Sequence, residues 1–228
     1  MIKQIQVKIC GVTNIDDALK IAALGVNAIG LVFYPKSKRN VSVERAKEIQ
    51  RSLPSRVSCV GVFVDESFLS IMQKVNDCHL DGVQLHGNET SQMVSNLRKT
   101  NLNVIKAFYI EGTPNIKDAK KYDASSCLVE CCPGKLPGGN ARFWNWGKLR
   151  SYKTYAPLIL AGGLTPDNIE EAVLSCIPDA VDISSGVEIT PGHKDILRVQ
   201  QLLKNLTSAS KKINPDSKRI IRTVFYEK

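Results

Sequence analysis

The chain has 228 residues, of which 43% are hydrophobic, and this is enough to bury one sizeable core in a single α/β domain. It lacks any run of about 18 apolar residues, which excludes a membrane-spanning helix, and its first residues, "MIKQIQVKIC", do not predict a signal peptide. With 31 basic and 22 acidic residues the net charge is +9, which favours an anionic partner, either nucleic acid or a small phosphate ester.

Short apolar runs alternate with longer amphipathic ones along the whole chain. The apolar runs are rich in β-branched residues and are hydrophobic on both faces, as parallel strands covered by helices are. In chain order, strands are predicted at residues 4–9, 28–32, 58–64, 82–85, 103–108, 126–130, 158–161 and 180–183.

The segments between these strands are predicted to be helical. The first helix begins after Asn14, a capping residue, and ends at Gly25. Further helices are predicted near 43–52, 67–77, 89–99, 115–121, 145–152, 167–176 and 193–205.

Eight strand–helix units in succession predict parallel pairing and a closed (β/α)8 barrel, in one catalytic domain over residues 1–207. An open doubly wound sheet is the alternative, but no GxGxxG follows the first strand. Residues 208–228 are expected to form a basic C-terminal tail, either mobile or docked on the surface through "IIRTVFYEK".

The positive charge is spread along the chain, without a stacking-aromatic motif or a helix-turn-helix signature. A small anionic substrate is therefore favoured, and nucleic acid, contacted through the tail, is the less favoured partner. Seven irregularly spaced cysteines fit reduced thiols and a cytoplasmic location. No short-spaced pair of metal ligands is present, so no metal is expected. Either a monomer or a homodimer is expected.

Two glycine- and serine-rich stretches follow the seventh and eighth strands, "LILAGGLTPDNI" and "VDISSGVEITPGHKD". In barrels, loops at these positions frequently bind phosphate through open backbone N–H groups and a helix start. A phosphate site is therefore predicted at Gly162, Gly163, Ser184, Ser185 and Gly186. The alternative is that the two glycines only permit a tight turn.

Four further residues stand at predicted strand ends, where barrel enzymes collect their chemistry. Cys10 is either a buried inert thiol or a reactive one, and Lys8 is predicted to point to the same side of the strand. Arg39 is either a solvated loop residue or a bidentate clamp on a carboxylate. His86 could be an acid–base group, a donor or a loop histidine, and Asp182 an acid, a ribose-hydroxyl acceptor or a loop cap.

Several stretches, in this order, are similar to the phosphoribosylanthranilate isomerase family of tryptophan biosynthesis: "KICGVTN", "GLVFYPKSKRNVS", "VGVFVD", "VQLHGNE", "LILAGGLTPDNI" and "VDISSGVEITPGHKD". They span about residues 5–205. The resemblance implies an Amadori rearrangement of N-(5-phosphoribosyl)anthranilate, a phosphoribosyl small molecule, to 1-(2-carboxyphenylamino)-1-deoxyribulose 5-phosphate. A general acid opens the furanose ring to a Schiff base, and a general base removes the proton at C2. The family uses no cofactor.

The resemblance also implies roles for single residues. Cys10 corresponds to the general base, and Arg39 to the arginine that holds the anthranilate carboxylate. His86 is expected to line the site, and Asp182 to lie near the ribose hydroxyls. The phosphate is expected on the two glycine- and serine-rich stretches.

The chain departs from the family pattern around its sixth strand. Glu130 stands where the family has an aspartate that serves as general acid, and a glutamate is one methylene longer. Asn140 and Ala141 replace a Thr-Gly pair, and Asn145 replaces an aspartate before tryptophan. Three readings follow: an isomerase with Glu130 as acid, a slow isomerase, or a relative that has drifted to another phosphosugar.

Two other functions remain as alternatives. A barrel isomerase of histidine biosynthesis would need aspartates at the ends of the first and fifth strands, where this chain has Cys10 and Phe108. A non-catalytic protein that binds a phosphosugar or nucleic acid would account for the changes near residues 130–145 and for the basic tail.

Overall fold

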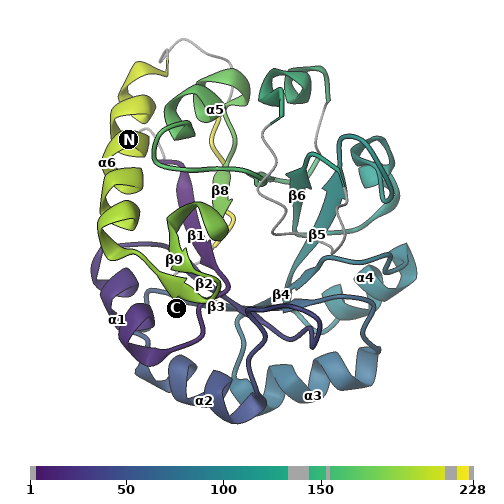
Figure 1. Cartoon of the computed structure of the whole chain (residues 1–228). Helices are drawn as coiled ribbons and strands as arrows, with labels where there is room; N and C mark the ends of the chain where they lie inside the picture. Colours follow the sequence, from purple (N-terminus) through teal and green to yellow (C-terminus); the bar gives the residue numbers. More distant parts are fainter. Residues whose placement is uncertain (1–3, 133–143, 153–154, 214–219, 226–228) are drawn as a thin grey trace.

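The computed structural model of the chain describes residues 4–132, 144–152, 155–213 and 220–225. Its strands form a closed parallel barrel in which β1 to β8 follow each other in chain order (Figure 1). The ring closes because β8 pairs in parallel with β1, from Gln6 opposite Ala180 to Ile9 opposite Ile183. The predicted (β/α)8 barrel is confirmed.

All strands of the barrel lie close to their predicted positions. Their residues are buried almost throughout, because helices cover the outer face and side chains fill the interior. The bounds are β1 (Gln6–Cys10), β2 (Ala28–Val32), β3 (Ser58–Phe63), β4 (Gly82–Leu85), β5 (Asn103–Tyr109), β6 (Ser126–Glu130), β7 (Leu158–Leu160) and β8 (Ala180–Ile183).

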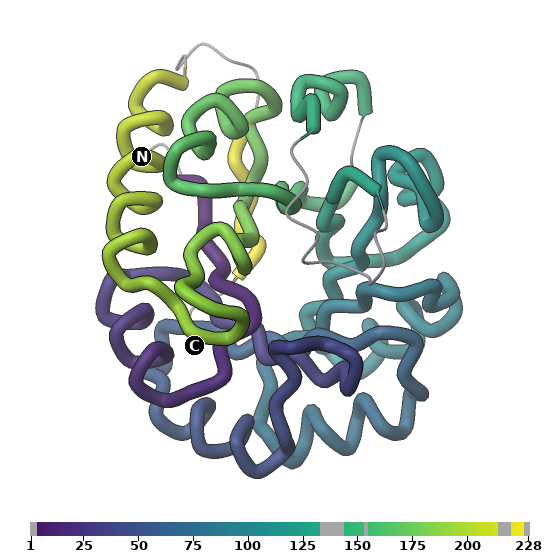
Figure 2. Tube along the Cα trace, viewed as in Figure 1, coloured from purple at the N-terminus to yellow at the C-terminus, as the bar shows by residue number. Residues whose placement is uncertain are grey.

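Helices form the outer ring, which the tube in Figure 2 follows around the barrel. Most begin at a polar side chain that accepts a hydrogen bond from the first turn, as Asn14 accepts from the backbone N–H of Asp17. No α-helix within the described residues is long and apolar enough to cross a membrane. The bounds are α1 (Ile15–Ala23), α2 (Val43–Ser52), α3 (Phe68–Cys78), α4 (Ser91–Arg98), α5 (Ile169–Cys176) and α6 (Ile196–Lys212).

Three connections differ from the predicted helices. The segments after β5 and β6 are the 3-10 helices η1 (Ile116–Lys121) and η2 (Trp146–Ser151). A six-residue segment shows the same apolar pattern in either helix type, so the sequence does not distinguish them. After β8 come a 3-10 turn, η3 (Ser185–Val187), and a hairpin of β9 (Glu188–Thr190) and β10 (His193–Lys194), which delays the start of α6.

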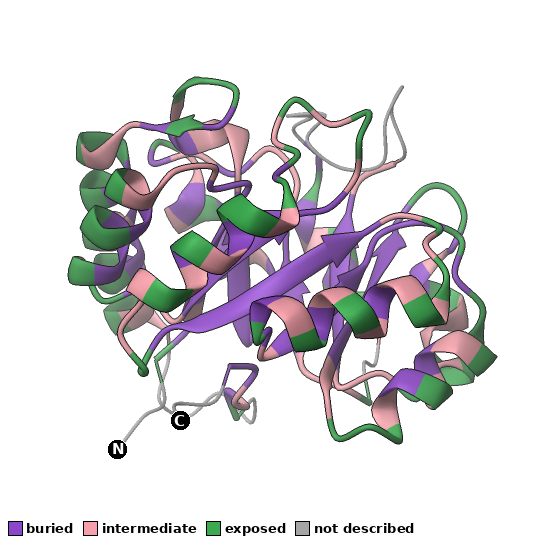
Figure 3. Cartoon of the chain, turned by 90° about the horizontal axis from the view of Figure 1, so that it is seen from below, coloured by how far each residue is buried: buried purple, intermediate pink, exposed green. Residues whose placement is uncertain are grey.

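The larger part of the core lies between the barrel and its helices. Figure 3 shows the strands buried and the helices buried only on their inner faces. Phe33 and Phe63 stack here with ring centroids 5.3 Å apart, and both rings are buried. A second, smaller apolar cluster fills the barrel interior.

The domain boundary expected after residue 207 falls inside α6, which continues to Lys212. Beyond it, residues 220–225 lie against the barrel, where Ile221, Val224 and Phe225 are buried. Part of the expected tail is therefore packed into the domain.

Replacement of Phe63 by alanine should destabilise the barrel, because it removes a buried aromatic ring from the core. We expect Phe63→Ala to lower the free energy of unfolding by about 3–5 kcal/mol, because it leaves a cavity beside Phe33. Leu69→Ala, at a side chain that is 79% exposed, is the control and should change it by less than about 0.5 kcal/mol. Urea unfolding followed by circular dichroism measures both, and equal midpoints would contradict this packing.

Candidate active site

The predicted site residues gather at one end of the barrel, where the parallel strands finish. Cys10 is the last residue of β1 and Glu130 the last of β6, while Asp182 lies in β8. His86 follows β4 directly and Arg39 lies in the loop after β2. Because all strands run in the same direction, these side chains share one mouth, which we call the catalytic mouth.

Cys10 lies beside a buried ion pair. Lys8 and Cys10 share the interior face of β1, as the alternation of the strand predicts. The Lys8 ammonium donates to both carboxylate oxygens of Asp182, at 3.0 and 2.9 Å, and its side chain is fully buried. A Cβ atom added at Gly30 would lie 2.8 Å from Cys10 Sγ and 2.9 Å from Lys8 Nζ. Glycine at this position therefore leaves the space that the thiol and the ammonium occupy.

The pKa of the Cys10 thiol is shifted in opposite directions by burial and by two neighbouring cations. Burial raises the pKa of Cys10, and the cations of Lys8 and Lys194 oppose that rise. For Lys8, burial alone would lower the pKa, but the charge of Asp182 raises it above its ordinary value. Lys8 is therefore a cation at neutral pH, and the thiolate of Cys10 becomes more abundant as the pH rises.

A second buried lysine joins the ends of β1 and β8. Lys194 in β10 donates to the carbonyl oxygens of Cys10 at 2.6 Å and Ser184 at 3.2 Å, and to Glu188 Oε1 at 2.7 Å. Glu188 also accepts from Nε and Nη2 of Arg39, at 2.8 and 2.6 Å. Sequence reasoning assigned no role to Lys194 or Glu188, although both lie in the "SSGVEITPGHKD" motif.

Arg39 thus already holds a carboxylate of the protein itself. Glu188 occupies its Nε and Nη2 edge as a bidentate partner, while no described residue accepts from Nη1. The arginine side chain lies on Gly11, where an added Cβ would come within 2.5 Å of Arg39 Cδ. Gly11 and Glu188 therefore fix the guanidinium at the catalytic mouth.

Glu130 lies on a different part of the mouth, beside His86. The His86 Nε2 atom is 3.8 Å from Glu130 Oε1 and has no hydrogen-bond partner among the described residues. Its Nδ1 lies 2.9 Å from the amide nitrogen of Gln84, and in this arrangement Nδ1 accepts and Nε2 carries the proton. Burial and the nearby Glu130 charge raise the pKa of Tyr109, so this phenol stays protonated. Glu130, His86 and Tyr109 are all buried, so this part of the mouth is enclosed.

A third buried lysine supports the loop that carries His86. Lys106 donates to Glu89 Oε2 at 3.0 Å and to the carbonyl of Gly87 at 2.8 Å. Glu89 Oε1 in turn accepts from the backbone N–H groups of Asp65 and Gly87, both at 3.0 Å. The sequence placed Lys106 at a strand end but gave no signal that Glu89 would be its partner.

The two glycine- and serine-rich loops meet at the ends of β7 and β8. Gly162 and Gly163 have φ angles of +83° and +69°, which favour glycine. An added Cβ at Gly186 would lie 1.8 Å from the carbonyl oxygen of Leu164, so the loops are in direct contact. No described residue accepts a hydrogen bond from the backbone N–H of Gly162, Gly163 or Ser185. Within the described part of the chain, these donors are open to an anion.

The three departures near β6 differ in what can be described. Asn145 caps η2, where its side-chain oxygen accepts from the backbone N–H of Gly147 at 3.0 Å. Asn140 and Ala141 lie outside the described residues. Trp144, just before Asn145, approaches the loop after β7, because an added Cβ at Gly162 would lie 3.4 Å from its Nε1.

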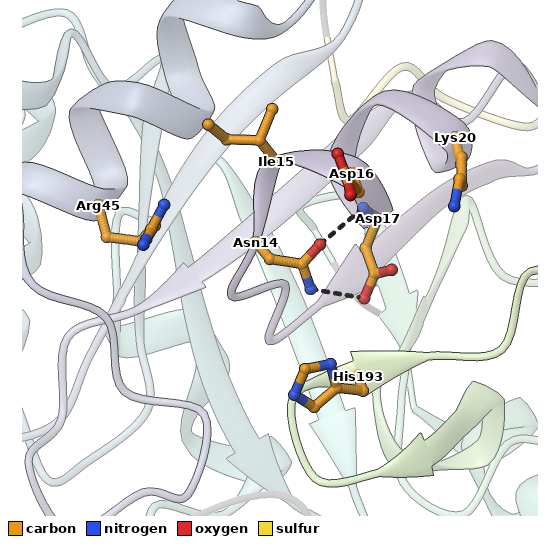
Figure 4. Close-up of a pocket in the computed structure, with 7 residues that line it drawn as sticks. All are labelled: Asn14, Ile15, Asp16, Asp17, Lys20, Arg45 and His193. Carbon is orange, nitrogen blue, oxygen red and sulfur yellow. Dashed lines mark hydrogen bonds between the residues drawn. The ribbon is translucent and has the colours of Figure 1, made fainter.

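A separate open hollow lies between α1, α2 and the β9–β10 hairpin (Figure 4). Asn14 and Asp17 bond each other there, at 2.8 and 2.9 Å, and these bonds cap α1. The hollow contains none of the predicted site residues, so we assign the chemistry to the catalytic mouth. It is lined by Asn14, Ile15, Asp16, Asp17, Lys20, Arg45 and His193.

Taken together, the barrel and its mouth define a class of protein: a (β/α)8 enzyme whose ionisable side chains gather where the parallel strands end. The family model described as N-(5'phosphoribosyl)anthranilate (PRA) isomerase matches residues 7–205. The isomerase of that name from Desulfatibacillum aliphaticivorans is 45% identical over 203 residues, 89% of this chain and 93% of its own length. The one from Thermotoga neapolitana is 42% identical over 201 residues, 88% of this chain and 97% of its own.

Solved structures agree with the sequence match. Phosphoribosyl anthranilate isomerase from Thermotoga maritima has a TM-score of 0.83 and 37% identity, and the alignment covers 90% of this chain and 100% of that one. A phosphoribosyl anthranilate isomerase in complex with reduced 1-(o-carboxyphenylamino)-1-deoxyribulose 5-phosphate has a TM-score of 0.79, 36% identity and the same coverage. The chain belongs to the N-(5'-phosphoribosyl)anthranilate isomerase family, and it is an isomerase. The resemblance found in the sequence is confirmed.

Removal of the Lys8 charge should make the Cys10 thiol harder to ionise. We expect Lys8→Met to raise the pH at which Cys10 reacts with iodoacetamide by about one unit or more, a tenfold loss of thiolate at a given pH. Mass spectrometry of the Cys10 peptide after timed alkylation measures the shift. Lys20→Met, at an exposed lysine of α1, is the control.

Because Lys8→Met leaves Asp182 as an unpaired buried carboxylate, the double variant Lys8→Met/Asp182→Asn is measured beside it. The neutral pair keeps the packing and should react at a pH between those of the wild type and Lys8→Met, since the Asp182 charge raises the thiol pKa. An unchanged alkylation profile in both variants would show that Lys8 does not act on Cys10.

Proposed function

We propose that Cys10 and Glu130 catalyse the conversion of N-(5-phosphoribosyl)anthranilate to 1-(2-carboxyphenylamino)-1-deoxyribulose 5-phosphate in tryptophan biosynthesis. One observation carries this proposal. In the ring of strands, β7 and β8 stand between β6, which ends in Glu130, and β1, which ends in Cys10. A sugar phosphate bound to the loops after β7 and β8 is therefore flanked by a carboxylic acid on one side and a thiol on the other.

The first half of the reaction belongs to Glu130. Its protonated carboxyl gives a proton to the furanose ring oxygen, the C1–O bond breaks, and the nitrogen lone pair forms the Schiff base. The proton on His86 Nε2 faces the Glu130 carboxylate, 3.8 Å away, and stabilises the charge that develops after transfer. Glutamate is one methylene longer than aspartate, so the Glu130 carboxyl extends further from the backbone. The rate of ring opening therefore depends on whether this carboxyl lies within hydrogen-bond distance of the furanose ring oxygen.

The second half belongs to Cys10. Its thiolate removes the proton at C2, and the electrons of the C–H bond neutralise the iminium nitrogen to give an enolamine. A proton then adds at C1 while the hydroxyl proton at O2 is lost, so the ketone forms and the atoms balance. Lys8, held by Asp182, favours the thiolate at the moment when the base is needed.

The remaining residues bind and orient the substrate. The backbone N–H groups of Gly162, Gly163 and Ser185 hold the phosphate, and the substrate carboxylate lies at the open Nη1 edge of Arg39. Asp182 is held by Lys8, which lies next to Cys10 on β1. It is therefore placed to bind the ribose hydroxyls on the Cys10 side of the sugar. Cys10, Cys78 and Cys127 are free thiols, which supports a reducing compartment such as the cytoplasm.

Loss of either proton-transfer group should reduce turnover and leave binding. We expect Cys10→Ser and Glu130→Gln each to lower kcat by about 10²–10⁴-fold, with KM changed much less. The loss of anthranilate fluorescence follows turnover. Glu130→Asp, which restores the family's residue, is the matched variant and should keep at least about a tenth of kcat, because the acid is retained.

Full activity in Glu130→Gln would show that Glu130 is not the general acid, and full activity in Cys10→Ser would show that Cys10 is not the general base. A large gain in Glu130→Asp would identify the wild-type chain as a slow isomerase.

Arg39 should contribute to binding more than to chemistry. We expect Arg39→Lys to raise KM by about tenfold or more, because a lysine cannot hold Glu188 and the substrate carboxylate with one planar group, while kcat falls less. Initial rates over a range of substrate concentrations separate the two constants. A fall in kcat at constant KM would place Arg39 in the proton-transfer steps instead.

A further inference from the structure

We propose that the end of the barrel opposite the catalytic mouth is a binding socket for the chain's own residues 221–225, which close it as a plug. We call these residues the C-terminal plug and the opposite end the closed mouth. The plug bonds to Gln6 and Asn103, so it lies where the strands β1 and β5 begin. The plug is made of a buried apolar end and a set of backbone hydrogen bonds.

The apolar part of the plug fills the interior of the barrel. Val224 and Phe225 are each only 2% exposed, and Phe225 is among the largest fully buried side chains of the described residues. Both belong to the interior cluster with residues from β2, β3, β5, β6, β7 and β8. The strands contribute the small side chains of Ala28 and Ala180 to this cluster. The Phe225 ring lies among these alanines and larger aliphatic side chains and fills space that the strands leave open.

The backbone of the plug is held by two amide side chains of the closed mouth. Gln6 Oε1 accepts from the backbone N–H groups of Val224 at 2.6 Å and Phe225 at 3.0 Å, and Gln6 Nε2 donates to the carbonyl of Phe225 at 2.7 Å. Asn103 Nδ2 donates to the carbonyl of Val224 at 2.8 Å. Gln6 and Asn103 are the first residues of β1 and β5. These two side chains therefore satisfy the backbone N–H and carbonyl groups of Phe225 and Val224.

A buried ion pair anchors the start of the plug. Asp179 is fully buried just before β8. Its Oδ1 accepts from the backbone N–H of Arg222 at 2.7 Å, and its Oδ2 lies 2.9 Å from Arg222 Nη2. The same guanidinium donates to the carbonyls of Tyr155 and Ala156, at 3.0 and 2.8 Å. A buried carboxylate is costly without a cation, so Asp179 favours the bound plug.

The plug is an addition to the family's barrel. The family match ends at residue 205, before the plug begins. The Thermotoga maritima structure is covered over 100% of its length by 90% of this chain. The plug also lies at the end of the strands remote from Cys10 and Glu130. We therefore expect it to stabilise the barrel and to leave the chemistry unchanged.

Phe225→Ala in the full-length chain tests the plug. We expect its Tm to fall by about 6–12 °C, because the cavity left inside the barrel destabilises a domain of this size by that much. Ile220→Ala, one residue outside the plug and 81% exposed, is the matched control and should melt with the wild type. The kcat at 25 °C should be unchanged in both variants.

Hydrogen exchange separates a bound plug from general stability. In the wild type, the backbone amides of Arg222, Val224 and Phe225 should exchange about 100-fold or more slowly than in a free peptide. Gln6→Ala removes the acceptor of two of them, and those two should lose their protection while the amides of the barrel strands keep theirs. The proposal would be overturned if these amides exchanged in the wild type as fast as in a free peptide. It would also be overturned if Phe225→Ala and Ile220→Ala had the same Tm.

Discussion

Three buried ammonium groups, each held by a carboxylate, determine the arrangement of the catalytic mouth. A lysine inside a protein is tolerated only with a charged partner and good hydrogen bonds, and loss of one partner costs about 3–5 kcal/mol. Each pair therefore fixes two structural segments against each other. The pairs are Lys8–Asp182 between β1 and β8, Lys106–Glu89 between β5 and the loop after β4, and Lys194–Glu188 between β10 and β9.

These pairs also divide the mouth electrostatically. Two of the lysines stand near Cys10 and lower the cost of a buried thiolate, while the carboxyl of Glu130 lies near the ring of His86 and near the phenol of Tyr109, whose raised pKa keeps it uncharged. The general base must be deprotonated and the general acid protonated at the same pH. The two groups therefore need surroundings that shift their pKa values in different ways. The loops after β7 and β8 lie between them and supply uncharged donors for a phosphate.

The barrel could be predicted from the sequence because each of its strands is a short apolar run bounded by turn residues, and eight of them alternate with amphipathic segments. The strand ends then indicated Cys10, His86 and Glu130 without any coordinates. The partners of the buried lysines could not be predicted in this way. Asp182 lies 174 residues from Lys8, and only the closed ring brings them together. The packing site of the tail could not be predicted either, because Phe225 is buried only against strands that lie far away in the sequence.

A crystal structure with the reduced product, 1-(o-carboxyphenylamino)-1-deoxyribulose 5-phosphate, tests the division of the mouth most directly. We predict that its phosphate accepts from the backbone N–H groups of Gly162, Gly163 and Ser185. The sugar C2 should then lie within reach of Cys10 Sγ, and the O4 hydroxyl within hydrogen-bond distance of the Glu130 carboxyl. A ligand bound with its phosphate elsewhere, or with Cys10 and Glu130 on the same side of the sugar, would contradict the assignment of base and acid.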